Sequence, residues 1–291
     1  MIQNTVSQHL KEKFGVKVYK LSLDGGMTCP NRDGRIGQKG CIFCSAGSGG
    51  FAEKYSGNII CQIENAKAAV EAKCKSGKYI AYFQSFTNTY APVSHLRKIF
   101  FEAISPEDIV GLAVATRPDC LPDETIALLT EINKIKPVWV ELGLQTVNEK
   151  TAEYIRRGYK TEIFDRAVIR LKKAGIQTVA HMIIGLPGET ASDAVKTARH
   201  ISEMGVDGIK FHLLHVLKDT DLEKDYLLGK FNVLSLEEYT EILKECILAL
   251  RKDIIIHRLT GDGPKRDLIA PLWSGDKKTV LNYITKVLKD I

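Results

Sequence analysis

Short apolar runs alternate with amphipathic stretches along most of this 291-residue chain, and this alternation restricts the fold more than any other feature. The apolar runs, which we expect to be β-strands, cover residues 16–24, 78–86, 109–117, 138–146, 176–185 and 208–217. The stretches between them have helical periodicity and cover residues 58–75, 93–104, 122–135, 161–174 and 190–204. Strand–helix alternation without long linkers is typical of a parallel sheet with right-handed crossovers.

Six such units favour an α/β fold, a partial (β/α)6 barrel of TIM type over residues 14–217. A doubly wound parallel sheet is the competing architecture. Residues 218–291 are predicted to form a C-terminal α/β extension that caps the barrel, with helices at 235–251 and 277–290 and a short strand between them. The chain is 44% hydrophobic and 26% charged, which is typical of a globular protein with a sizeable core.

The start of the chain, MIQNTVSQHLKEKFG, is polar and charged and lacks the apolar segment of a signal peptide. No stretch approaches ~18 uninterrupted apolar residues, so we expect no membrane span and a cytoplasmic protein. Seven cysteines in such a chain are not expected to form a disulfide framework. The net charge of +6 is compatible with a nucleic-acid partner, and equally with an ordinary solvated surface.

Three cysteines, Cys29, Cys41 and Cys44, lie together in the segment CPNRDGRIGQKGCIFC, directly after the first predicted strand and within a predicted loop at 25–50. A structural zinc site normally has four ligands, and the first histidine downstream is His95, so zinc is poorly supported. Three thiolates can instead hold a four-iron cluster whose fourth iron stays open to a small ligand.

Polar side chains share one face of two predicted strands. These faces consist of Lys20, Ser22 and Asp24 on the first strand and Glu141, Gly143 and Gln145 on the fourth. Polar groups in a sheet that is buried on both sides are costly unless they are paired or face a wet cavity. One interpretation is a structural ion pair, such as Lys20 with Glu141. The interpretation we favour is a polar ligand pocket in the barrel mouth, where α/β folds bind ligands.

The segment DGGMTCPNRDG…GCIFC resembles the cysteine motif of radical S-adenosylmethionine (SAM) enzymes. Their usual motif is Cys-x3-Cys-x2-Cys, whereas this chain has eleven residues in the first gap. A long spacing between the first two cysteines occurs in the Elongator-catalytic-subunit-like branch. The sequence of the segment is similar to that of the YtqA/YhcC subgroup of this branch. The resemblance implies that Cys29, Cys41 and Cys44 hold a [4Fe-4S] cluster and that Phe43 packs near the adenine of SAM.

Three segments after the later strands extend the resemblance. HMIIGLPGET resembles the family's turn beside the adenine, which implies contacts from Gly185, Pro187 and Gly188. ELGLQTVNEKT resembles the region that contacts the SAM ribose, which implies roles for Glu141 and Gln145. YIRRGY resembles the segment in which the family places a basic residue against the SAM carboxylate. Arg157 is the predicted residue, because a guanidinium can make a two-point contact with a carboxylate. A surface arginine at a helix end is the alternative.

The segment YFQSFTNTY departs from the family, because it lacks the Gly-Gly-Glu stretch that holds the methionine amino group. Gln84, Ser85 and Thr87 are the predicted replacements. In the implied mechanism the open iron binds the amino and carboxylate groups of SAM, a reduced cluster cleaves the sulfonium bond, and a 5′-deoxyadenosyl radical abstracts hydrogen from the substrate.

The implied substrate is tRNA, since the nearest branch modifies wobble uridine, for example by converting a carboxymethylaminomethyl side chain to aminomethyl. A reductase or a flavodoxin- or ferredoxin-type protein is the implied electron donor. Two alternatives stay open, a radical SAM enzyme that acts on a small metabolite and a non-catalytic iron–sulfur or zinc binding module.

Other candidate residues lie outside these motifs. The basic loop HRLTGDGPKR is either a solvated loop or a contact to substrate phosphate through Arg258, Lys265 or Arg266. His212 and His215 have an odd separation, so on one strand they point to opposite faces and do not bind one metal together. Cys120 is expected to be buried rather than catalytic.

Overall fold

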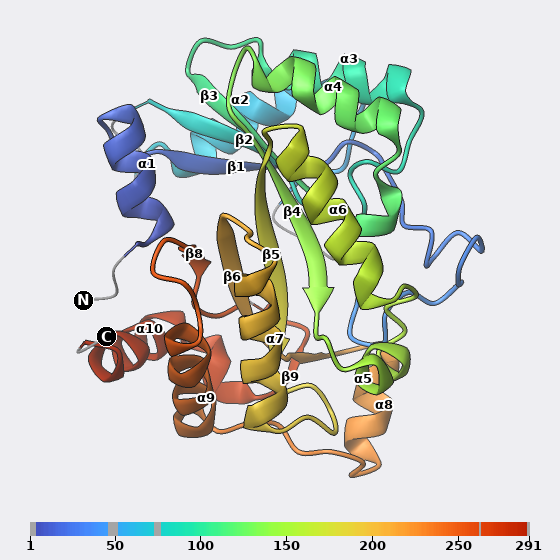
Figure 1. The fold of residues 1–291 in the computed structure, drawn as a ribbon, viewed down its shortest axis with the longest axis vertical. Helices are drawn as coiled ribbons and strands as arrows, with labels where there is room; N and C mark the ends of the chain where they lie inside the picture. The colour runs from blue at the N-terminus through green and yellow to red at the C-terminus, as the bar shows by residue number, and fades with distance from the viewer. Residues whose placement is uncertain (1–3, 46–51, 73–76, 262, 290–291) are drawn as a thin grey trace.

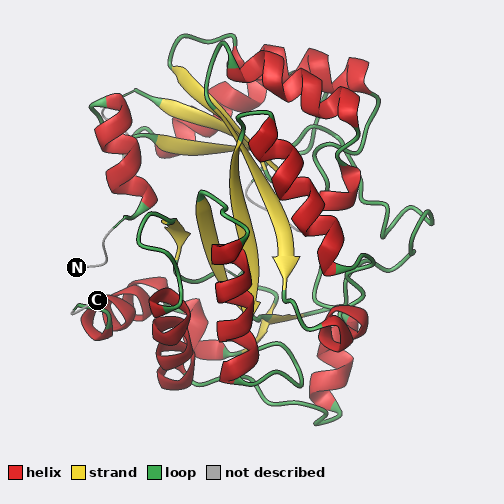
Figure 2. Cartoon of the chain, in the orientation of Figure 1, coloured by secondary structure: helices red, strands yellow, loops and turns green. Residues whose placement is uncertain are grey.

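Seven parallel strands form a sheet that curls into an open half-barrel, with helices on its outer face (Figures 1 and 2). The computed structural model describes residues 4–45, 52–72, 77–261 and 263–289. In spatial order the strands are β1 (Tyr19–Leu23), β2 (Tyr79–Phe83), β3 (Ile109–Thr116), β4 (Val138–Gln145), β5 (Gln177–Ile184), β6 (Gly208–Leu213) and β8 (Ile255–Arg258). Because β1 to β6 follow chain order without a reversal, the doubly wound alternative is wrong and the partial barrel is confirmed.

The outer face of the sheet is covered by helices whose apolar stripes build the main core. They are α2 (Ile59–Val70), α3 (Val93–Ile104), α4 (Asp123–Asn133), α6 (Thr161–Lys173), α7 (Ala191–Glu203) and α9 (Leu236–Leu248). In α6, for example, Phe164, Val168 and Leu171 are buried one or two turns apart on the same side of the helix. Each such side chain contributes about 1.5–3 kcal/mol through removal of its surface from water.

The N-terminal end of the half-barrel is closed by α1 (Val6–Phe14), a helix that the sequence analysis did not predict. Thr5 and Gln8 form a capping box at its start, and Gly15 ends it in a left-handed conformation. Leu10 of this helix joins the interior apolar cluster that includes Ile80 and Trp139. Apolar side chains therefore fill the interior beside α1, and barrels of this type bind ligands at the opposite end, where the carboxyl ends of the strands lie.

The sixth predicted strand, 208–217, is wrong as a single element. β6 ends at Leu213, and β7 (Val216–Leu217) pairs with β9 (Leu268–Ala270) in a separate antiparallel sheet. The short strand predicted in the tail is present as β8, and it pairs in parallel with β6 as the seventh strand of the main sheet. The C-terminal segment thus completes one wall of the half-barrel, and the division at residue 218 stays a prediction.

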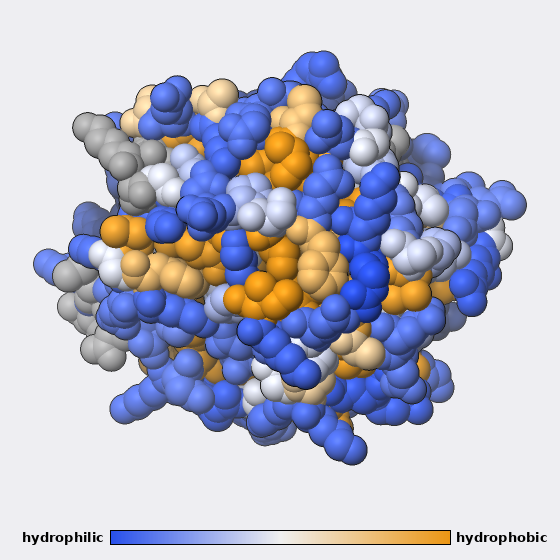
Figure 3. Space-filling view, turned by 90° about the horizontal axis from the view of Figure 1, so that it is seen from above, coloured by the Kyte–Doolittle hydropathy of each residue, from blue (hydrophilic) through white to orange (hydrophobic). Residues whose placement is uncertain are grey.

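The remaining elements are short or terminal. They are α5 (Glu149–Tyr154), α8 (Asp221–Leu227), α10 (Lys277–Val287) and the 3-10 turns η1 (Pro118–Cys120) and η2 (Leu272–Gly275). Seen from above the view of Figure 1, the surface is mainly hydrophilic, with apolar side chains gathered near the middle of the face (Figure 3). Within the described ranges, no helix has the length and apolar character needed to cross a membrane.

Candidate active site

The loop after β1 carries the three clustered cysteines and is tied to the turn that follows α5. The side-chain amide of Asn31 donates to the carbonyl oxygen of Arg156 over 2.6 Å, and the backbone N–H of Ile42 donates to the carbonyl of Ile155 over 3.2 Å. Within the loop, the guanidinium of Arg32 donates to the carbonyl of Cys44 over 2.6 Å. The loop is thereby folded back on itself at the carboxyl edge of the sheet, while residues 46–50 of the predicted loop lie outside the described residues.

The three cysteine thiols lie near enough to influence one another electrostatically. All three side chains are half-buried, and none is in a disulfide. Burial, together with the neighbouring Cys44 and Cys29, raises the pKa of the Cys41 thiol to about 11. A bound cation reverses this effect, since metal coordination deprotonates thiols. This donor set fits a cationic iron centre that needs three thiolates.

A site for one metal ion does not form in the described parts of the chain, where no three His, Cys, Asp or Glu side chains are arranged around a single ion. Zinc needs four such ligands close together. A four-iron core is larger, so its three thiol ligands stand farther apart than the ligands of one ion. The described residues thus provide no four-ligand zinc site.

The turn after β5 lies against the cysteine loop. Phe43 packs on the same apolar cluster that contains Leu186 of the turn. Gly185 has φ +89°, and a Cβ there would lie 3.0 Å from Cδ1 of Leu234, so both the conformation and the space require glycine. The predicted adenine contacts Phe43, Pro187 and Gly188 therefore belong to segments that meet.

The end of β4 has an unusual backbone at Gln145. This residue has φ +68° and follows a shift in the pairing register between Gly143 and Gln145. A left-handed conformation is rare for a residue other than glycine, and such strained positions concentrate at ligand sites. Its side chain is half-buried at the barrel mouth.

Comparison with known proteins agrees with this geometry. The Radical SAM superfamily profile matches residues 31–201, and the Radical_SAM C-terminal domain profile matches residues 206–290. The chain is 46% identical over 288 residues to the protein YtqA of Bacillus subtilis (strain 168), covering 99% of this chain and 89% of YtqA. The chain belongs to the radical SAM superfamily.

Two further relatives and one solved structure are also similar to this radical SAM protein. Identity to YhcC of Escherichia coli (strain K12) is 37% over 99% of this chain and 92% of YhcC. Identity to the tRNA uridine(34) acetyltransferase of Methanocaldococcus jannaschii is 27% over 60% of this chain and 32% of that protein. The structure of Methanocaldococcus infernus Elp3 with an N-terminal deletion has the same fold, with a TM-score of 0.69 and 18% identity over 93% of this chain and 63% of that one.

Radical SAM proteins bind a [4Fe-4S] cluster and SAM, and two predicted SAM contacts have different surroundings in this structure. The Glu141 side chain is fully buried and accepts hydrogen bonds from Lys20 Nζ over 2.8 Å and Tyr82 Oη over 2.7 Å. It also contacts Lys210 and, over 2.9 Å, His181. The interpretation as a structural ion pair is confirmed, and these partners leave no room for a ribose contact.

Arg157 is buried too, and its guanidinium donates to the protein itself. Its donors reach the carbonyl oxygens of Leu144, Thr146 and Tyr159 over 2.5–3.0 Å, and one contacts Glu149 over 3.1 Å. With 1% of the residue exposed, it is neither a surface arginine nor free to reach a carboxylate of SAM. The motif could not reveal this, because the end of β4 and the segment after α5 meet around Arg157 only in the folded chain.

The replacements predicted for the missing Gly-Gly-Glu stretch differ in exposure. Gln84 is half-buried just beyond the end of β2, whereas Ser85 and Thr87 are buried. The backbone N–H of Thr87 donates to the carbonyl of Thr28 over 3.2 Å, which joins this segment to the cysteine loop. Gln84 is therefore the one of the three whose side chain stays accessible at the barrel mouth.

The three basic residues of the C-terminal loop are separated in space. Arg258 belongs to β8 and is the register partner of Lys210 on the neighbouring strand β6. Lys265 and Arg266 are exposed, with 91% of the Arg266 side chain accessible. The prediction that His212 and His215 point apart is wrong, because the strand ends between them. A Cβ at Gly261 would lie 3.4 Å from Nδ1 of His212 and 3.3 Å from Cε1 of His215, so both rings face this glycine.

Cys120 is buried, as expected. Burial and the neighbouring Asp119 raise the pKa of its thiol to about 12. A thiol with so high a pKa is protonated at neutral pH, which argues against a nucleophile.

Arg117 is a site residue that the sequence analysis missed. It follows β3 directly, pairs with Asp119 over 2.7 Å and donates to the carbonyl of Arg157 over 2.9 Å. Its charge lowers the pKa of Cys41 and acts on Cys29 as well. A basic residue at the carboxyl end of a barrel strand was the signal that could have identified it.

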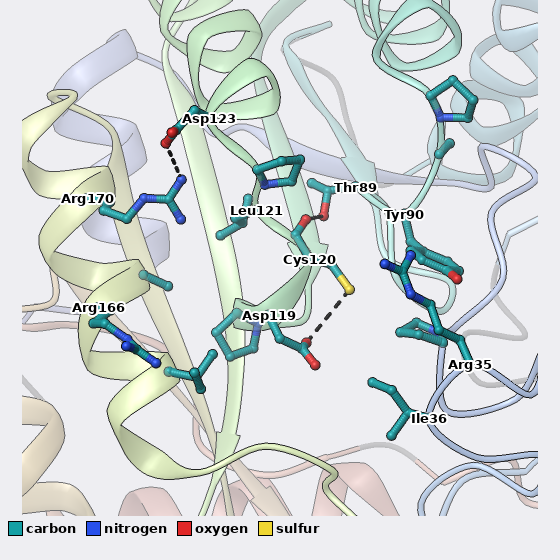
Figure 4. A pocket seen from close by; sticks show the side chains of 17 residues that line it. Arg35, Ile36, Thr89, Tyr90, Asp119, Cys120, Leu121, Asp123, Arg166 and Arg170 are labelled. Atoms are coloured by element: carbon teal, nitrogen blue, oxygen red, sulfur yellow. Dashed lines mark hydrogen bonds and ion pairs between the residues drawn. The ribbon is translucent and has the colours of Figure 1, made fainter.

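A groove of about 970 Å³ lies on the outer side of the cysteine loop (Figure 4). Arg35 and Ile36 of the loop face η1 and the helix α6, from which Arg166 and Arg170 line the opposite wall. Arg170 is paired with Asp123 over 2.6 Å, and Arg35 lies over the ring of Tyr90. The groove thus brings basic and aromatic side chains beside the cysteine loop.

Proposed function

We propose that this chain is a radical SAM enzyme that modifies tRNA by remodelling the side chain of wobble uridine, for example from carboxymethylaminomethyl to aminomethyl. The observation that carries the reaction class is the three-thiol loop at the carboxyl end of the half-barrel, packed against the glycine turn after β5. The tRNA substrate is supported by the similarity to a tRNA uridine(34) acetyltransferase over 60% of this chain.

In this proposal Cys29, Cys41 and Cys44 hold the cluster, and the loop contacts of Asn31 keep them in place. The bound cluster and SAM supply a 5′-deoxyadenosyl radical, which is the difficult part of the chemistry. The chain itself binds and orients. Phe43 and the turn Gly185–Gly188 would flank the adenine, Gln145 would contact the ribose, and Gln84 would accept from the methionine amino group.

Recognition of tRNA and of the electron donor would fall to surfaces near the barrel mouth. The groove with Arg35, Arg166 and Tyr90 combines cations and an aromatic ring, which is the combination that binds unstacked nucleotides. A tRNA substrate and a flavodoxin- or ferredoxin-type donor would place the reaction in the cytoplasm.

The deciding experiment uses reconstituted protein under anaerobic conditions with SAM and dithionite. We expect 5′-deoxyadenosine from the wild type and none from a variant with all three clustered cysteines changed to alanine. Addition of tRNA bearing carboxymethylaminomethyluridine should increase 5′-deoxyadenosine and change the mass of that nucleoside. If SAM is cleaved but tRNA does not change the rate, a small-metabolite substrate is favoured. If the protein holds a full, reducible cluster and cleaves no SAM even with tRNA present, the non-catalytic module is favoured.

A further inference from the structure

Basic side chains outnumber acidic ones in the middle of the half-barrel. Lys20, Lys210 and Arg258 lie on β1, β6 and β8. Glu141 on β4 is the acid whose charge opposes the lowering of the pKa values of His181 and His257. Lys20 and Lys210 both contact Glu141. In the described part of the chain, Arg258 has neither a hydrogen bond nor an ion pair. Among the residues that the structure describes, the charge of Arg258 therefore has no carboxylate partner.

The position of Arg258 follows from the pairing of β6 with β8. The register shifts between Ile209 and Lys210, so that Arg258, rather than His257, stands opposite Lys210. Register partners in a sheet point to the same side, and Lys210 points to the barrel interior, where it donates to Tyr82 Oη over 2.9 Å. The charge of Arg258 also affects Tyr82, His181, Lys210 and His212. Arg258 thus belongs to the interior cationic group.

Two imidazoles of this group carry nitrogens that lack a partner. Nε2 of His212 and Nδ1 of His257 are buried and make no hydrogen bond within the described residues. A buried polar atom without a partner is costly, so such atoms usually mark a bound water, ion or ligand. They give a second, independent indication that something polar belongs here.

The group can be reached from solvent. The side chain of Lys20 is 22% exposed and that of His181 is 18% exposed, while His212 and Arg258 are half-buried. Glu141 beneath them is fully buried. Part of the cationic group is therefore accessible from solvent, whereas its shared counter-charge, Glu141, is not.

We propose that this cationic group, formed by Lys20, Lys210, His212, His257 and Arg258, binds a carboxylate or phosphate group of the substrate inside the half-barrel. The assignment to the substrate rests on the proposed function, in which the target nucleotide enters the barrel. The excess positive charge selects an anion, and the unpartnered imidazole nitrogens supply hydrogen bonds to its oxygens. Burial lowers the pKa of Lys210 to about 7 and that of His181 to about 4, and an anion in the site would raise both.

The test uses the full-length reconstituted protein, labelled with ¹³C in the histidine rings and kept anaerobic. NMR spectra are recorded while acetate, and in a second series inorganic phosphate, is added. We expect saturable shifts of the His212 and His257 signals, assigned through single His→Gln variants, with one or both anions. The anion that binds more tightly identifies whether the substrate group is a carboxylate or a phosphate.

Arg258→Gln should weaken this anion binding about tenfold, the effect of losing one charge-assisted hydrogen bond. Arg199→Gln on the exposed face of α7 is the matched control and should leave it unchanged. Because Arg258 has no partner within the described residues, its replacement should not unfold the protein, and Arg258→Lys should restore part of the binding.

Three outcomes overturn the proposal. They are an absence of saturable shifts, equal binding by the wild type and Arg258→Gln, and loss of the anion signal when SAM is added, since the last would assign the site to the carboxylate of SAM. The measurement needs neither tRNA nor turnover. Anion binding can therefore be present in a protein that fails the tRNA assay, and the two proposals can fail separately.

Discussion

The side-chain amide of Asn31 donates to the backbone carbonyl of Arg156 over 2.6 Å, and thereby joins the cysteine loop to the turn after α5. The same amide lies 3.6 Å from Sγ of Cys41. Asn31 is 4% exposed, so it is a buried polar group whose hydrogen bonds are satisfied by the two segments that it connects. The position of the central thiol depends on this contact.

Asn31→Ala should therefore loosen the loop, because it leaves the Arg156 carbonyl without this donor at a cost of about 1–3 kcal/mol. We expect reconstituted protein to hold less iron and to lose it faster to a chelator. Asn65→Ala, which removes an exposed side-chain contact to Glu53, is the control. Equal iron retention in both variants would contradict a supporting role for Asn31.

Each of the variants Cys29→Ser, Cys41→Ser and Cys44→Ser should lose the visible absorbance and most of the iron of the reconstituted protein, because each removes one of three thiolates. Cys61→Ser and Cys120→Ser should retain both, since Cys61 is exposed on α2 and Cys120 is a buried thiol with a raised pKa. Iron and sulfide analysis of the five variants checks this. A full cluster in any of the first three would remove that cysteine from the ligand set.

Arg157→Lys should lower the stability of the fold by about 2–4 kcal/mol, because an ammonium cannot satisfy three buried carbonyl oxygens with the geometry of a guanidinium. Chemical denaturation of the wild type and the variant measures the loss. SAM affinity, determined by calorimetry where both proteins are folded, should change little. A selective loss of SAM affinity with unchanged stability would restore Arg157 as a contact to the carboxylate of SAM.

Glu189 makes stability depend on pH. Burial raises its pKa to about 7, compared with about 4.3 in an unfolded chain, so between these values the folded state binds a proton that the unfolded state does not. Stability from this group is therefore greatest below pH ~4.3 and falls as the pH rises to about 7.

Glu189→Gln removes this titration. The free energy of unfolding of the variant relative to the wild type should increase from pH 4 to pH 7 by on the order of 2 kcal/mol, allowing for partial solvent screening, and then stay constant. Urea unfolding at four pH values measures the difference. A difference that does not change with pH would show that Glu189 is ionised at neutral pH in the fold.

The variant Glu141→Gln should be strongly destabilising, by about 3–5 kcal/mol, because buried Lys210 and half-buried Lys20 would lose their shared carboxylate. Thermal unfolding measures the loss. Lys20→Met with Glu141→Gln should be less damaging than the sum of the two single changes, since the residues form one network. Strict additivity would contradict the network.

Much of the fold could be read from the chain, because strand–helix alternation is a local pattern. The cysteine loop followed from spacing and residue type, since Cys29, Cys41 and Cys44 are close in sequence. The turn at Gly185 was also local, and its left-handed backbone agrees with the glycine that the motif contains.

Other features depended on which segments meet. Glu141 and Arg157 are charged residues in segments that resemble SAM-binding motifs, and sequence reasoning assigned both to SAM. Only the tertiary structure decided their roles, because Lys210 and the Thr146 carbonyl come from separate elements and provide the buried partners that these charges require. For the same reason, Arg258 appeared to belong to a surface loop until the pairing of β8 with β6 placed it inside the half-barrel. The sequence alone indicated the cofactor class, through three clustered cysteines and a resemblance carried by short contiguous motifs. Burial and charge pairing arise between segments that meet only in the folded chain, and these were decided by the fold.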